Sequence, residues 1–299
     1  MFDFVGKKRY FFVLSAAIIL IGIILFAVNG IPWGIDFTGG TVMTVEFDKP
    51  VEKSDVEKEF AAIGHDEAVI QDTGDNTFIV RTKELEDSER LDLIDSLKEM
   101  GMTETPEFNS VSDPIAKEKA SGAAWAVVIA AIGILLYISW AFRKLPKPFR
   151  YGTCAIIALV HDVFIALAVF AILGSALDLE INLMFITGLL TVIGYSVNDT
   201  IVVFDRIREN LGKVSRQGFE TVVNNSLVET LNRSLNTSLT TLIVLVAVYL
   251  FVGEAIESFI LVLIVGVISG TYSSIFIASQ FLVVWETGAA RRLLRRGSR

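Results

Sequence analysis

Two neighbouring polar residues lie inside an apolar part of this chain. The stretch GYSVNDTIVVFDRIREN (194–210) follows the uncharged run INLMFITGLLTVI (181–193) and places Asn198 beside Asp199. An aspartate at the centre of a membrane helix costs about 2.5–3.5 kcal/mol on insertion scales, so such a residue is functional by default. Asp199 is therefore a candidate for reversible proton binding.

Two more polar groups share this environment. His161 and Asp162 lie about eleven residues into another apolar run, which places them near the middle of a bilayer if that run is helical. A polar stripe at helical spacing follows later in the chain. It consists of Arg233, Asn236, Thr237 and Thr240.

We expect Arg233 to reach inward and pair with Asp199, because the two lie on consecutive antiparallel segments. The arginine favours an ionised carboxylate and burial favours a neutral one, a balance that suits a group whose protonation changes. The alternative is that the polar groups only make structural hydrogen bonds between helices. That alternative is the stronger one for the serines and threonines, and it stays open for His161 and Asp162.

The elements that must position these groups are membrane helices. The chain has 299 residues, of which 53% are hydrophobic, and its mean hydropathy is +0.58. About 20 apolar residues are needed to cross a bilayer as a helix. Six segments meet this requirement, the first of which we expect to be a retained anchor. They are 10–28, 123–142, 152–173, 182–204, 236–253 and 258–285.

The distribution of charge predicts the orientation of these spans. The short segments 1–9, 143–150, 206–233 and 286–299 hold 17 of the 26 basic residues, whereas the long loop after the first span holds 22 of the 34 acidic residues. Basic residues in short loops stay on the cytoplasmic side. Both termini are therefore expected in the cytoplasm, and the long acidic loop is expected outside it.

The long loop, 30–120, predicts a small α+β domain. Its pattern reads as strand, helix, two strands joined by a turn, helix and strand, which is the βαββαβ order of a ferredoxin-like sandwich. Ser54 and Glu57 are spaced as a helix capping box. The expected elements are strands at 41–47, 67–72, 76–82 and 106–112, a helix from Ser54 to about 63, and a helix at 88–101 whose apolar face is Leu91, Ile94, Leu97 and Met100.

Glycines predict two further features. GIDFTGGT (34–41) sets Gly34, Gly39 and Gly40 around Asp36, and we expect a tight turn that couples the first span to the domain. It lacks the Gly-Lys-Ser/Thr of a phosphate-binding loop. The other feature is close helix packing in the last span, at Gly266, Gly270 and Ser273.

Enzymatic and metal chemistry find little support. The carboxylates of the long loop are spread over helix faces, Cys154 is the single cysteine, and the two histidines lie far apart. We expect no metal site, no cofactor other than protons as coupling ion, and no nucleic-acid partner. An intramembrane aspartyl protease using Asp162 and Asp199 is disfavoured, because Ser196-Val197-Asn198 stands where such enzymes need Gly-x-Gly.

Five motifs in this order resemble the SecF members of the SecD/SecF family. They are GIDFTGGT, LVHDV (159–163), GYSVNDTIVVFDRIREN, ETLNRSLNTSLTT (229–241) and GTYSSIFIAS (270–279). The resemblance spans nearly the whole chain and places it in the resistance-nodulation-division superfamily of proton-driven transporters. One departure is Gln280, where the family often has a proline, so a kink there is in doubt.

The resemblance implies a non-enzymatic subunit that works with SecD to assist protein translocation, driven by the proton-motive force. Its partners would be SecD, the channel proteins SecY, SecE and SecG, a translocating preprotein and membrane lipid, in a prokaryotic plasma membrane. It implicates Asp199 and Arg233 in proton transport, and we add Asn198, Asp162 and His161 as relay candidates.

This assignment divides the chain into four parts: 1–29 (cytoplasmic N-terminus and first span), 30–120 (extracytoplasmic domain), 121–285 (five spans) and 286–299 (basic cytoplasmic tail). Two alternatives remain open. One is an autonomous small-molecule exporter of the same superfamily, and the other is a passive scaffold for SecD and the channel.

Overall fold

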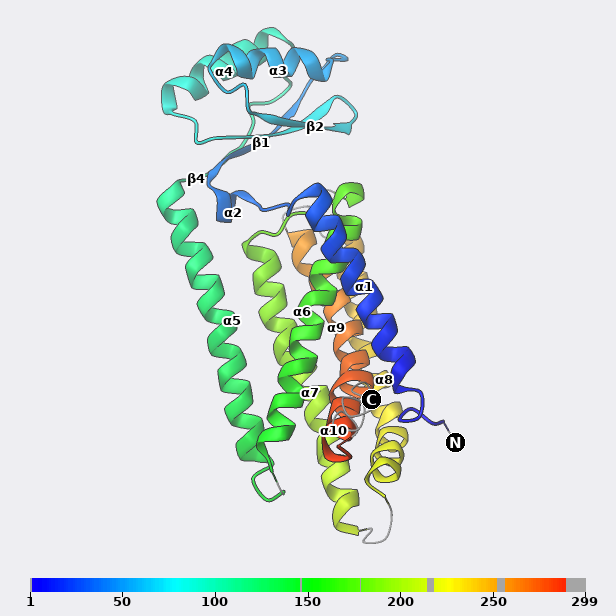
Figure 1. The fold of residues 1–299 in the computed structure, drawn as a ribbon. Coiled ribbons are helices and arrows are strands. Elements are labelled where there is room, and N and C mark those ends of the chain that lie inside the picture. Colours follow the sequence, from blue (N-terminus) through cyan, green and yellow to red (C-terminus); the bar gives the residue numbers. More distant parts are fainter. Residues whose placement is uncertain (1, 146, 178, 214–217, 252–255, 289–299) are drawn as a thin grey trace, which may run out of the picture. The chain divides into compact units, whose positions relative to one another are not determined.

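The computed structural model describes residues 2–145, 147–177, 179–213, 218–251 and 256–288. The chain divides into two compact units (Figure 1). The helical unit consists of residues 1–32 and 125–299, and the α/β unit consists of residues 33–124.

Within the described residues, six helices are long and apolar enough to cross a membrane, and they correspond to the six predicted spans. The last span is continuous but is assigned in three parts. The helices are α1 (Lys8–Asn29), α5 (Asp113–Ala141), α6 (Phe149–Leu177), α7 (Leu183–Lys213), α8 (Phe219–Phe251), and α9 (Glu257–Ser273) with η2 (Ser274–Ala278) and α10 (Ser279–Glu286).

Helix α5 begins ten residues before the apolar segment predicted for it. Its first residues, DPIAKEKASG, are polar but compatible with a helix. Asp113 lies in the first turn, where a negative charge is favourable, and proline is tolerated in a first turn because its missing N–H has no helical partner. The helix therefore starts in the α/β unit and continues into the helical unit.

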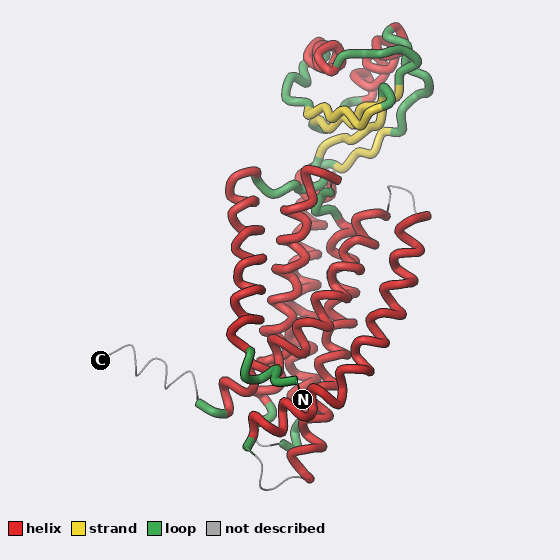
Figure 2. The backbone as a smooth tube through the Cα atoms, turned by 90° about the vertical axis from the view of Figure 1, so that its right-hand side faces the viewer, coloured by secondary structure: helices red, strands yellow, loops and turns green. Residues whose placement is uncertain are grey.

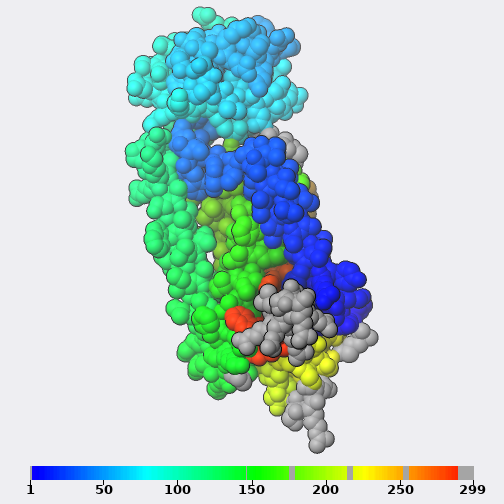
Figure 3. Space-filling model, viewed as in Figure 1, coloured from blue at the N-terminus to red at the C-terminus, as the bar shows by residue number. Residues whose placement is uncertain are grey.

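The helices of the helical unit approach each other closely at glycines. A Cβ on Gly266 would lie 2.1 Å from a Val192 atom of α7, and a Cβ on Gly270 would lie 2.8 Å from Ser196. Helix α1 packs along α6, and its Gly22 meets Ala168 in the same way. In the space-filling view α1 lies on the surface of the helical unit (Figure 3).

The last span contains a π-helical turn, η2, shortly before Gln280. The absence of proline had put a kink there in doubt, and a π turn is the irregularity found instead. Gln280 is fully buried, and its Nε2 donates to the Ile275 carbonyl at 3.4 Å. A π turn adds a residue to the helical ladder, and such turns are frequent at functional sites.

The α/β unit is a four-stranded antiparallel sheet with two helices (Figure 2). The strand order is β2-β3-β1-β4, and each neighbouring pair is antiparallel. Val45, Phe60, Phe78 and Leu97 belong to the single apolar cluster that the sheet and helices enclose. In chain order the elements are α2 (Ile35–Thr38), β1 (Gly40–Glu46), α3 (Lys53–Ala62), β2 (Val69–Gly74), β3 (Thr77–Thr82), α4 (Asp87–Glu99) and β4 (Phe108–Val111).

Two local predictions in this unit are wrong. Helix α3 begins at Lys53 with Glu52 as its N-cap, so Ser54 is already inside the helix and does not cap it. A capping box is present instead at α4, between Glu86 and Glu89. On α4 the buried residues are Leu93 and Leu97, and Met100 packs beside them, so most of the predicted face is turned inward. Leu91 is the wrong member of that face, because it is 64% exposed.

The segment GIDFTGGT forms one helical turn, α2, followed directly by β1. Gly39 and Gly40 have φ angles of 75° and 113°, which strongly favour glycine. A Cβ on Gly40 would lie 2.4 Å from the Thr82 carbonyl oxygen, so the backbone of β3 also excludes a side chain. Asp36 forms an ion pair of 2.7 Å with Lys119 of α5.

Candidate proton-binding site

Asp199 lies on α7 with its side chain turned into the helical unit, and the residue is only 8% exposed. Its Oδ1 accepts a hydrogen bond of 2.9 Å from the Ser234 hydroxyl of α8. Its Oδ2 is buried, and no hydrogen bond from the described part of the chain reaches it. A buried carboxylate with one unsatisfied oxygen is costly as an anion. Binding a proton there would remove the buried charge.

Arg233 does not form the predicted ion pair with Asp199. Its side chain lies on the exposed face of α8. Successive residues of an α-helix point about 100° apart. With Ser234 turned towards Asp199, the preceding arginine must point elsewhere.

The inward face of α8 is a row of hydroxyls that sequence reasoning missed. The signal was present, because these residues are spaced every four positions along the helix. Ser238 also contacts the hydroxyl of Thr271 on α9, which lies close to Asp199 as well. The buried row consists of Ser226, Thr230, Ser234 and Ser238.

The predicted polar stripe of α8 faces the opposite way. Its members are exposed on the helical unit, as is Asn198 on α7. Asn198 therefore does not share the buried environment of its neighbour Asp199. The exposed stripe consists of Arg233, Asn236, Thr237 and Thr240.

Asp162 is buried at the centre of a hydrogen-bond cluster and is 2% exposed. Its Oδ1 accepts a hydrogen bond from Ser269 at 2.5 Å and lies 3.1 Å from His161 Nδ1. Its Oδ2 accepts hydrogen bonds from Ser196 at 2.6 Å and from Ser273 at 2.8 Å. Four donors from three helices can therefore satisfy this one carboxylate. Ser273, predicted only as a packing residue, is one of them.

His161 links this cluster to α1. Its Nε2 lies 2.9 Å from the hydroxyl of Ser15, and its ring stacks on Tyr272 of α9 with 5.9 Å between centroids. Ser15 also donates to the Tyr272 hydroxyl at 3.2 Å. Tyr272 in turn donates to the Phe11 carbonyl at 2.9 Å. Helices α1, α6 and α9 thus meet at His161.

Known proteins match this chain over nearly all of its length. A model of the C-terminal part of the protein-export membrane proteins SecD/SecF matches residues 92–288, and a SecD/SecF GG-motif model matches residues 24–51. The protein translocase subunit SecF of Thermobaculum terrenum is 44% identical over 99% of this chain and 98% of its own. The chain belongs to the SecD/SecF family.

Two further members of the SecD/SecF family are longer than this chain. The protein translocase subunit SecDF of Bacillus subtilis is 36% identical over 95% of this chain but only 38% of its own length. The crystal structure of SecDF from Thermus thermophilus, described as a translocon-associated membrane protein, matches with 34% identity and a TM-score of 0.83. That match covers 96% of this chain and 39% of the longer one.

Charged residues that follow Asp199 on α7 form a cluster of ion pairs. Asp205 pairs with Arg208, but Arg206 pairs with Glu229 of α8 at 2.5 Å and with Glu209 at 2.5 Å. The Arg206–Glu229 pair joins the ends of α7 and α8, the same two helices that Asp199 and Ser234 join. Charges near the ends of membrane helices fix their position at the interface.

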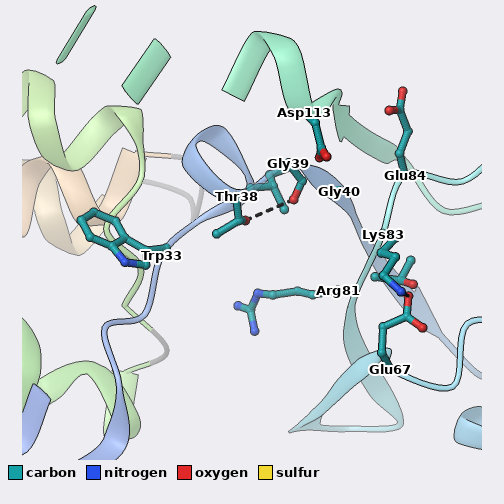
Figure 4. Close-up of a pocket in the computed structure, with 11 residues that line it drawn as sticks. Trp33, Thr38, Gly39, Gly40, Glu67, Arg81, Lys83, Glu84 and Asp113 are labelled. Carbon is teal, nitrogen blue, oxygen red and sulfur yellow. Dashed lines mark hydrogen bonds and ion pairs between the residues drawn. The ribbon is translucent and has the colours of Figure 1, made fainter. Parts of the chain in front are cut away.

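The α/β unit contains a cavity of about 430 Å³ next to the family's GG motif (Figure 4). Lys83 and Glu67 form an ion pair of 3.4 Å at its wall. The pKa of Glu67 is lowered chiefly by its own backbone amide, and Lys83 adds to this effect. In the part of the chain that the structure describes, no group of three or more His, Cys, Asp or Glu could hold a metal ion. The buried carboxylates of the helical unit are the stronger candidates for function.

Proposed function

We propose that this chain is the SecF subunit of a SecD–SecF complex, and that it uses the proton-motive force to assist Sec-dependent protein translocation. The names of its relatives support the Sec pathway. The observation that carries proton coupling is the buried, half-satisfied carboxylate of Asp199 between α7 and α8. Proton relays in membrane proteins are built from such intramembrane acids.

Protonation of Asp199 would change how α7 and α8 are held together. As an anion it attracts the Ser234 hydroxyl through a charge-assisted hydrogen bond, which is about twice as strong as a neutral one. A proton on Oδ2 removes the charge and weakens that bond. The two helices can then repack, while the Arg206–Glu229 pair keeps their cytoplasmic ends together.

The available energy suffices for such a switch. One charge moving through 100 mV yields about 2.3 kcal/mol, so a gradient of roughly 150–200 mV supplies about 3.5–4.6 kcal/mol per proton. Converting a 1:99 equilibrium into 99:1 takes about 5.5 kcal/mol. One proton would therefore supply most of this energy, and two would exceed it.

SecD is the proposed cover for the exposed polar stripe on α8. Arg233 and Asn236 would be costly against lipid, since polar groups at membrane depth normally face protein or water. Against a second subunit they can meet acceptors, and Arg233 can pair with a carboxylate of SecD. Asn198 of α7 is exposed in the same way. Arg233 and Asn198 thus keep a place in the relay, at the subunit boundary.

The α/β unit is proposed to lie outside the cytoplasm as a ferredoxin-like sandwich that contacts the emerging preprotein. Its order β1-α3-β2-β3-α4-β4, with β3 between β1 and β2, supports this. The GG turn, with Gly34, Asp36, Gly39 and Gly40, would couple it to α1. Both termini would lie in the cytoplasm, and SecY, SecE and SecG would be the channel that the complex assists.

The test is proton flux into vesicles that contain SecD and this chain. Asp199→Asn should abolish flux, because the amide cannot exchange a proton. Asp205→Asn is the matched control: it is the same substitution on the same helix, at an exposed residue paired with Arg208. Full flux in Asp199→Asn would refute the proposal. A full loss in Asp205→Asn would show that the assay reports general damage.

A further inference from the structure

We propose that His161 and Asp162 form a second proton-binding site, which fastens α1 to the helical unit when it is occupied. The inference deepens the proposed function, on which its role in export rests. Asp199 and this site share α7, because Ser196 contacts Asp162 and lies one turn before Asp199. The protonation state of His161 follows from a count of the hydrogens that its contacts require.

The surroundings of the Asp162 carboxylate favour its ionised form. Each of its oxygens has two neighbours, and three of the four neighbours are serine hydroxyls. Ser196 and Ser269 donate to it, and Ser273 shares its single hydrogen between Oδ2 at 2.8 Å and the Gly270 carbonyl at 3.2 Å. The fourth neighbour is His161 Nδ1, 3.1 Å from Oδ1. A carboxylate that accepts several hydrogen bonds is stabilised in its ionised form. With the carboxylate ionised, the contact with Nδ1 requires a hydrogen on that nitrogen.

The contacts on the other side of the ring require a hydrogen on Nε2. The Tyr272 hydroxyl has one hydrogen, and the Phe11 carbonyl can only accept it. The oxygen of Tyr272 is then the acceptor for Ser15, at 3.2 Å. This uses the single hydrogen of Ser15, so Ser15 must accept from Nε2 at 2.9 Å. All contacts of the His161 ring are satisfied together when His161 is an imidazolium.

Charge supports the presence of one such proton on the pair, and the contacts above place it on His161. An imidazolium beside a carboxylate is neutral overall, whereas removing the proton leaves one negative charge among buried groups. A buried charge without a partner is strongly unfavourable. The ionisable groups in contact with His161 are Asp162 and Tyr272, and the neighbours from α1 and α7 in the cluster are hydroxyls.

Loss of that proton changes how α1 is held. Ser15 then has one hydrogen for two acceptors, His161 Nε2 and the Tyr272 oxygen, so one of its two links to the bundle is broken. A cavity of about 270 Å³ lies between α1, α6 and α9 and is lined by Leu14, Ile18 and Val265 beside Ser15 and His161. It leaves α1 room to shift. Helix α1 leads directly into the α/β unit along the chain, so proton release here would loosen the element that carries that unit.

The chain contains only two histidines, so the test is nitrogen NMR of ¹⁵N-histidine-labelled full chain with SecD in lipid vesicles. A His65→Gln variant identifies the His161 signals. At pH 7 both nitrogens of His161 should carry hydrogens. Asp162→Asn should convert His161 largely to the neutral form at this pH, because a buried cation without a counter-ion is strongly unfavourable.

A neutral His161 at pH 7 in the native protein would overturn the inference, and so would an imidazolium that persists unchanged in Asp162→Asn. If that variant does not fold, the native spectrum alone decides.

Ser15→Ala should leave the α1 backbone more mobile, whereas Thr187→Ala, at an exposed hydroxyl bonded to its own helix, should not. Failure of the Asp199 flux test with an imidazolium at His161 would instead refute the proposed function and leave the second site standing.

Discussion

Asp162 and Asp199 are both buried aspartates of the helical unit, yet their surroundings differ. Asp162 has four potential donors, two for each oxygen, whereas Asp199 has one donor and a buried oxygen that no hydrogen bond from the described residues reaches. A saturated carboxylate holds helices together, and an unsaturated one gains from a proton. The number of donors therefore separates a carboxylate that is stabilised as an anion from one that gains by taking up a proton itself, where residue type and burial do not.

The largest expected effect concerns stability. Asp162→Asn should lower the free energy of unfolding by about 3–5 kcal/mol, the range for breaking a buried ion pair. Asp199→Asn should cost little or stabilise, because it removes a poorly satisfied buried charge. Denaturation of the purified variants in detergent measures both. Equal losses of stability in the two variants would contradict the proposed difference between the two aspartates, since both carboxylates would then be structural.

Ser234→Ala should have an intermediate effect. It removes the hydroxyl that donates to Asp199, and a hydrogen bond to a charged group contributes about 1.5–3 kcal/mol. Proton flux at a given pH should therefore change, because the anion is no longer favoured by that bond. Thr187→Ala is the control, since its exposed hydroxyl bonds to the Leu183 carbonyl of its own helix. Identical flux profiles for the two variants would show that Ser234 does not tune Asp199.

Arg233→Gln should have a small effect on the isolated chain and a large one in the complex. Without SecD, an exposed side chain of this kind changes stability by no more than about 0.5 kcal/mol. With SecD, proton flux should be lost if Arg233 acts across the subunit boundary. Comparing unfolding of the chain alone with flux in SecD vesicles separates these contributions. A large loss of stability in the isolated chain would indicate that Arg233 pairs with Asp199 within this chain.

The smallest effect extends the comparison to a carboxylate in the α/β unit. The pKa of Glu89 is lowered, chiefly by the Glu86 backbone amide, with His65 adding to it. Its contribution to stability is therefore complete above the ordinary glutamate pKa of about 4.3 and is lost as pH falls through the lower folded-state value. Glu89→Gln should remove this part of the acid sensitivity, as measured by unfolding at pH 6 and pH 3. An unchanged pH dependence would contradict the role of the capping box.

Much of this architecture could be predicted because it depends on local composition. The six spans follow from apolar length, and the strand and helix order of the α/β unit follows from its changes of period. Asp199 stands out for the same reason, as an acid in an apolar run. The predictions of which residues of α4 and α8 point into the interior were partly wrong. Leu91 and Leu93, like Arg233 and Ser234, are near neighbours, and tertiary packing decides which of them points inward.

The Asp162 cluster could not be predicted in this way. Its donors come from positions 161, 196, 269 and 273, on three helices, and each serine alone is an ordinary small residue of a membrane helix. Only their meeting in space gives them a common acceptor. His161 and Asp162 stand out in the sequence as polar residues in an apolar run. The sequence alone, however, does not show which donors surround the Asp162 carboxylate.

The π turn at Ser274–Ala278 affects how the last span can be compared with related chains. A π turn holds one more residue than an α turn, so the helix beyond Ala278 is rotated by about 100° relative to an uninterrupted α-helix. Alignments that assume constant helical phase will assign Gln280 and the residues after it to the wrong face. Deleting one residue within the turn should restore that phase and turn Gln280 out of the interior.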